Sequence, residues 1–125
     1  MPLSGGTFTG AVTGTTIADS KGDLRRIVIN NKTSAYTLVA SDAGKAIYIS
    51  SGGVTVPNAV FSAGDAVTIV NNSTSSQTIT QGSNVSLFNT GDAGATGNRT
   101  LLARGMATLW FANSSDAYIS GSGLE

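Results

Sequence analysis

Residues 54–71 read VTVPNAVFSAGDAVTIVN, and this stretch carries the pattern that decides the fold. Apolar residues alternate with other residues at 54–56 and again at 66–70, and the turn signal Gly64-Asp65 separates the two runs. A period of two places successive side chains on opposite faces of a strand, so each run is predicted to bury one face. Pro57 cannot donate to a strand ladder and is expected to close the first strand.

The same alternation recurs outward from this stretch, between turn signals about ten residues apart. No segment longer than ten residues holds helical spacing. Valine, isoleucine, threonine and aromatic residues dominate the runs, as is typical of strands. We therefore predict an all-β domain over residues 23–123, an antiparallel β-sandwich or small barrel, with strands at 25–30, 36–40, 46–50, 53–56, 66–71, 76–81, 84–88, 99–103, 106–112 and 116–120.

Composition excludes several classes of function. Seven Lys and Arg residues balance seven Asp and Glu residues, so the sequence has no basic footprint for nucleic acid or an anionic membrane. Without Cys and His, the chain lacks thiolate nucleophiles, imidazole bases and the usual transition-metal ligands. No apolar run approaches the length of a bilayer span, and the first residues do not resemble a signal peptide. We assign no catalytic residue, no cofactor and no metal ion.

The internal carboxylates are expected to serve turns. Acid/base catalysis usually needs two carboxylates held in a cleft. Asp42 and Asp65 stand next to glycines ahead of strands, where an aspartate side chain accepts backbone N–H bonds. Residues 89–98 lack the acidic density of a calcium loop and are expected to form a long inter-strand loop. The sequence pairs none of the internal carboxylates, among which are Asp23, Asp42, Asp65, Asp92 and Asp116.

The aromatic residues leave two interpretations open. They form either a platform for sugar stacking or packing in the core or between subunits, and packing is favoured. Leu109 and Phe111 share one face of strand 106–112, whereas Met106 and Trp110 share the other, so both faces carry bulk. Such a strand is central or is pressed against another subunit. The candidates are Trp110, Tyr36, Tyr48 and Tyr118.

The arginines also have two possible roles. They are expected to bond backbone carbonyls and carboxylates at the surface or at an interface. Clustering in one open groove would instead indicate a site for an anionic glycan. The set comprises Arg25, Arg26, Arg99 and Arg104, and the last of these lies in the expected inter-strand turn Ala103-Arg104-Gly105.

Residues 1–22 differ from the rest, because a glycine-rich strip with few large apolar side chains cannot offset the entropy of ordering its own backbone. Residues 2–14, PLSGGTFTGAVTG, closely resemble the PLSGGT-x-TG-x-x-TG repeat in the shafts of trimeric phage tail fibres. This resemblance implies an extended trimeric shaft segment. Three copies would then wind together through Leu3, Phe8, Val12 and Ile17.

A second resemblance covers residues 36–123, including YTLVASDAGKAIYI, VTVPNAVFSAGDAVTIVN and NRTLLARGMATLWF. These strings are similar to the small β domain at or near the ends of many phage tail-fibre and other virion proteins. The resemblance implies a non-enzymatic homotrimer, made in the bacterial host cytoplasm and carried in the virion. Such a domain would contact other virion proteins and present a surface to a host glycan or protein; the sequence assigns no receptor-binding residue.

Two other functions are alternatives to a receptor-binding tail-fibre domain. A trimeric capsid decoration or cement protein would also be small and β-rich, but it would bind the virion shell. A glycan-cleaving enzyme is disfavoured by chain length and by the missing carboxylate pair. Residues 124–125, Leu-Glu, are predicted to be a cloning scar, because the only Glu of the chain stands at its last position.

Overall fold

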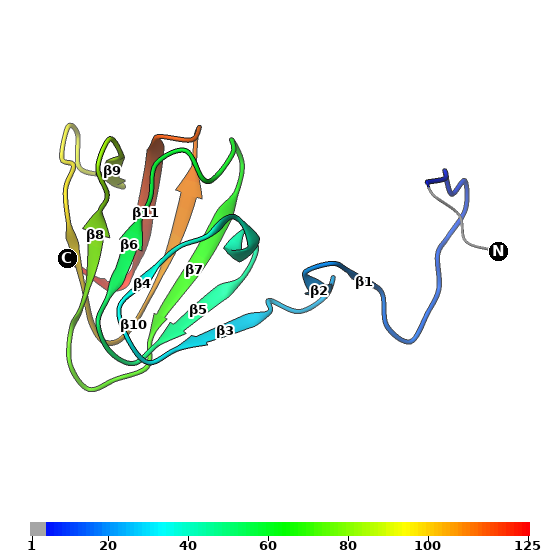
Figure 1. Ribbon diagram of the computed structural model, residues 1–125, viewed down its shortest axis with the longest axis horizontal. Coiled ribbons are helices and arrows are strands. Elements are labelled where there is room, and N and C mark those ends of the chain that lie inside the picture. The colour runs from blue at the N-terminus through cyan, green and yellow to red at the C-terminus, as the bar shows by residue number, and fades with distance from the viewer. Residues whose placement is uncertain (1–4) are drawn as a thin grey trace.

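The computed structural model describes residues 5–125, and the chain from residue 29 onward forms a two-layered β-sandwich (Figure 1). Its largest sheet follows the order β3-β5-β7-β10-β8-β6-β4, with β11 pairing to β10 and β9 pairing to β11. The predicted all-β class is confirmed, with a nearly closed, barrel-like sheet. The elements are β3 (Ile29–Lys32), β4 (Tyr36–Thr37), the 3-10 helix η1 (Ala40–Asp42), β5 (Ala46–Ile49), β6 (Val54–Val56), β7 (Ala66–Asn71), β8 (Gln77–Gln81), β9 (Ser86–Asn89), β10 (Arg99–Phe111) and β11 (Asp116–Leu124).

The predicted antiparallel pairing is wrong for most of this sheet. Five strand pairs are parallel, namely β3 with β5, β5 with β7, β4 with β6, β6 with β8, and β9 with β11. Parallel neighbours need a long crossover, and from β3 to β8 each crossover contains a strand of the opposite layer. The chain therefore winds as a flattened coil from β3 to β8, and each turn adds one strand to each layer (Figure 1).

Strand β10 closes the coil by passing from one layer to the other. Its residues 99–101 pair antiparallel with β8, and its residues 106–110 pair antiparallel with β7. Between these two parts the register shifts, and Arg104 takes a positive φ of 59°. The expected turn at Ala103-Arg104-Gly105 is therefore a bend inside one long strand. The Arg104 guanidinium donates to the Asn72 side-chain oxygen at 2.9 Å, which ties the bend to the end of β7.

Alternate residues of both layers meet in a single apolar core, as the period of two predicts. Phe61 and Phe111 stack within it, with ring centroids 4.4 Å apart. On β10 the side chains of Leu109 and Phe111 are fully buried, whereas Met106 and Trp110 are about half exposed on the outer face. The other fully buried core residues include Ile47, Ile49, Val56, Ile69, Ile79, Leu87, Leu101 and Ile119.

Asp42 is a carboxylate that is 1% exposed, and three donors satisfy it. It accepts hydrogen bonds from the Tyr36 hydroxyl at 2.7 Å, the Asn30 side-chain amide at 2.9 Å and the Val39 backbone N–H at 2.9 Å. Asp65 accepts the Ser62 backbone N–H at 2.9 Å in an exposed loop. The expected turn role of both aspartates is confirmed, and Asp42 in addition joins β3, β4 and η1.

The Tyr36 hydroxyl is expected to make stability fall at alkaline pH. Burial, and next the hydrogen bond to Asp42, raise the pKa of Tyr36 from 10.0 to about 12. The unfolded chain then loses this proton first, so the stabilisation is complete below pH 10 and is lost as the pH rises to about 12. The loss should be about 2 kcal/mol, measured by urea unfolding at a series of pH values.

A Tyr36→Phe variant should show a flatter decline over the same range, because phenylalanine has no proton to lose. Lys32 lies over the Tyr36 ring, with its Nζ 4.3 Å from the centroid, so the two side chains are in contact. A Lys32→Gln variant separates its contribution. Identical slopes for wild type and Tyr36→Phe would contradict the assignment to Tyr36.

The N-terminal segment extends away from the sandwich (Figure 1). Residues 5–16 lie outside every helix and strand and make no backbone hydrogen bond to the rest of the described chain. The small hairpin of β1 (Ala18–Asp19) and β2 (Gly22–Asp23) follows, so the expected domain boundary after residue 22 falls inside β2. At the other terminus, Glu125 exchanges two backbone hydrogen bonds with Thr100.

Candidate binding site

Three aromatic side chains form a row on the outer face of neighbouring strands. Tyr118 of β11 stands opposite Trp110 of β10 and opposite Phe88 of β9. The rings of Phe88 and Tyr118 stack at 4.9 Å, and the Trp110 ring lies 6.1 Å from that of Tyr118. The residues that alternate with them point into the core, so the strand period fixes all three rings on the outside.

The row ends in an open pocket of about 520 Å³, within the size range of small-molecule sites. Its lining consists of Phe88, Tyr118 and residues 89–94. Gly91 and Gly94 both have a φ of +80°, and these conformations fold the loop back over β9. The Asn89 N–H then donates to Ala95 at 3.4 Å, so backbone bonds shape this wall.

Asp92 differs from the other internal aspartates. Asp19, Asp23, Asp42, Asp65 and Asp116 each accept at least one side-chain hydrogen bond. Among residues 5–125, only Asp92 of the internal carboxylates makes no side-chain hydrogen bond or ion pair, and it lines the pocket. Its neighbours Asn89 and Thr90 also line the pocket, and across the described chain their side chains make no hydrogen bond either. Three polar side chains are therefore free to meet a ligand.

The structure divides the aromatic candidates. Trp110 and Tyr118 lie together, whereas Tyr48 lies on β5, separated from β10 by β7, and Tyr36 is bonded to Asp42. The sequence interpretation missed Phe88, which stacks on Tyr118. Its position beside the inward-facing Leu87 was the available signal, since alternation puts Phe88 on the outer face.

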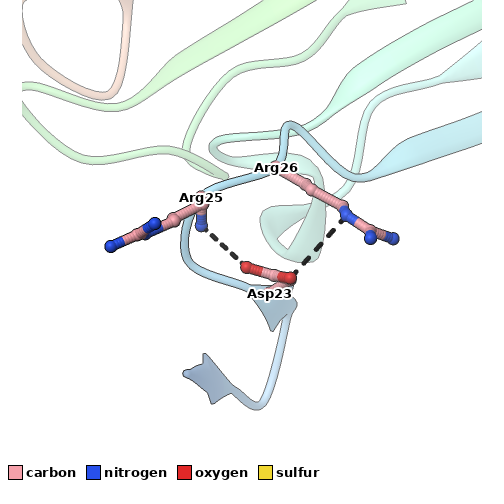
Figure 2. A network of polar contacts seen from close by, with 3 residues as sticks. All are labelled: Asp23, Arg25 and Arg26. Atoms are coloured by element: carbon pink, nitrogen blue, oxygen red, sulfur yellow. Dashed lines mark hydrogen bonds and ion pairs between the residues drawn. The ribbon is translucent and has the colours of Figure 1, made fainter. Parts of the chain in front are cut away.

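The arginines do not gather in one groove. Asp23 accepts the Arg25 backbone N–H at 2.9 Å and lies 3.7 Å from the Arg26 Nε, and the two arginine side chains point away from each other (Figure 2). Arg104 is bonded to Asn72, and Arg99 has a buried Nε on β10. The arrangement gives no cationic site for an anionic glycan.

Trimer-interface candidates Phe8, Val12 and Ile17 are 80%, 53% and 38% exposed. Leu3 lies outside the described residues.

In residues 5–125, no group of three acidic, His or Cys side chains is placed to hold a metal ion, and no helix is long and apolar enough to span a membrane. No protein-family model matches the chain, and no curated protein matches it.

Proposed function

We propose that this chain is the terminal part of a trimeric phage tail fibre and that its β-sandwich presents a receptor-binding surface to the host cell. The observation that carries the proposal is the segment at residues 5–16. It overlaps residues 2–14, which resemble a shaft repeat, it makes no backbone hydrogen bond to the rest of the described chain, and it exposes Phe8 and Val12. Copies of the same segment would supply both the apolar contacts and the backbone partners that it lacks.

The pocket beside Phe88 and Tyr118 supports the proposal that the protein adheres to the host cell. The pocket combines two aromatic rings with free polar side chains, which is the composition of recognition sites. A trimer would hold three such pockets together, so weak contacts would sum through effective concentration. The work of the protein would then be mechanical and adhesive, with no chemical step.

The oligomer is tested first. Light scattering is expected to give a mass about three times the 12.5 kDa chain. Phe8→Asp should weaken the trimer by about tenfold or more, because it removes from each chain a ring that the trimer would bury and places three like charges together. Thr9→Asp adds the same charge next to the ring and should have a smaller effect.

Two outcomes would contradict this scheme in different ways. A stable monomer at micromolar concentration would refute the trimeric fibre. A trimer unaffected by deleting residues 1–22 would place the interface on the β-sandwich, with the N-terminal segment ordered only by its neighbours.

The partner is tested by mixing labelled protein with host cells and, separately, with virions that lack fibres or decoration proteins. Saturable binding to cells alone is expected. Binding to virion shells alone would instead favour a capsid decoration protein, and reducing ends released from host polysaccharide would reveal an enzyme.

A further inference from the structure

We propose that the pocket beside Phe88 and Tyr118 binds one neutral hexose residue of a surface glycan. This inference rests on the proposed receptor-binding function and names its ligand class. Phe88 and Tyr118 line the pocket with aromatic surface, against which the C–H groups of a pyranose can pack. Both rings sit on paired strands, so β9 and β11 hold the surface rigidly.

The free polar side chains match the hydroxyl groups of a sugar. A carboxylate accepts hydrogen bonds at both oxygens and cannot donate, so Asp92 suits two neighbouring hydroxyl donors. The Asn89 amide donates as well as accepts, which suits a hydroxyl or ring oxygen. Because neither side chain bonds within the described chain, a ligand would not have to break an internal hydrogen bond to reach them.

Charge selects among saccharides. Of the described residues, those that line the pocket include one carboxylate, Asp92, and no lysine or arginine. A sugar bearing carboxylate, sulfate or phosphate would therefore meet repulsion with no compensating cation. None of the four arginines lines the pocket, and Arg25 and Arg26 lie beside Asp23 (Figure 2). The pocket accordingly favours neutral sugars over acidic ones.

The test uses the full chain and saturation-transfer NMR with defined probes. These are the methyl glycosides of glucose, galactose, mannose and N-acetylglucosamine, with glucuronic acid and N-acetylneuraminic acid as acidic counterparts. Saturation of the ring C–H protons is expected for at least one neutral probe and for neither acid. Asp92→Asn and Tyr118→Ala should each weaken binding by about tenfold, since each removes charge-assisted hydrogen bonds or the stacking surface.

Matched variants control for general effects. Asp19→Asn removes an exposed carboxylate elsewhere, and Tyr48→Ala removes a tyrosine of similar exposure on the same sheet; both should bind like wild type. Asp92 is exposed, so Asp92→Asn should fold normally even if Tyr118→Ala does not.

Three results would overturn the inference. These are binding of the acidic probes alone, binding that survives both pocket variants, and no binding of any neutral probe. If the last occurs while wild type still binds cells, the ligand is not a neutral sugar and the proposed function stands. If the wild-type protein does not bind host cells at all, the proposed receptor-binding function is itself contradicted.

Discussion

Replacing Phe111 with alanine is expected to lower the free energy of unfolding by about 3–5 kcal/mol. The ring is fully buried and stacks on Phe61 at 4.4 Å. The smaller side chain would leave a cavity where the two layers meet, because the surrounding strands can relax only in part. Domains of this size have a total stability of about 5–15 kcal/mol. A large part of the folding free energy should therefore be lost, seen as a lower urea midpoint at unchanged slope.

Trp110→Ala is the matched control, because Trp110 is adjacent in sequence and also aromatic, yet is 46% exposed on the opposite face. It should cost about 1 kcal/mol. If Phe111→Ala and Trp110→Ala lower the free energy of unfolding equally, the assignment of Phe111 to the inner face and Trp110 to the outer face of β10 is contradicted for the isolated chain. A loss at Trp110 that grows with protein concentration would instead show that another copy covers the outer face.

Asp42→Ala should lower the free energy of unfolding by about 2–4 kcal/mol. The substitution leaves three hydrogen-bond donors without an acceptor, on Tyr36, Asn30 and Val39. The site is too buried for bulk water to take the place of the carboxylate. It also removes the link between β3, β4 and η1. The measurement is urea unfolding at neutral pH, where the Tyr36 hydroxyl is protonated in both the folded and unfolded chain.

Asp65→Ala provides the comparison, because Asp65 occupies a similar turn but accepts one backbone N–H in an exposed loop. Asp65→Ala should lower the free energy of unfolding by about 1 kcal/mol. Losses of equal size would show that Asp42 acts only as a turn residue. In that case the hydrogen bonds to Tyr36 and Asn30 would contribute nothing measurable.

Local sequence located several strands but not their partners, and it placed the first strand at 25–30, whereas β3 spans Ile29–Lys32. The predicted strand at 66–71 coincides with β7, and the strand predicted at 46–50 ends one residue beyond β5. The two strands predicted at 99–103 and 106–112 are one strand, β10, since Arg104 and Gly105 bend the chain without reversing it. A turn signal reports a local backbone preference, and whether the chain then reverses depends on distant partners.

The binding site could be predicted only in part for the same reason. Alternation around Trp110 correctly indicated a strand with bulk on both faces. The pocket, however, combines Tyr118 with Phe88 and Asp92, which stand on different strands and a loop. Nothing local distinguishes Asp92 from the other aspartates, because its lack of a partner becomes visible only once the other side chains have found theirs.

The sequence by itself determined that this chain is all-β, which side chains share a face on strands such as β7 and β10, and that Asp42 and Asp65 serve turns. These properties follow from a period of two and from contacts within a few residues. Tertiary structure alone decided the parallel coil, the burial of Asp42 against Tyr36, and the meeting of Phe88, Tyr118 and Asp92. A period of two fixes the face of a side chain but leaves strand direction and partner free, and these are selected by long-range pairing across the whole core.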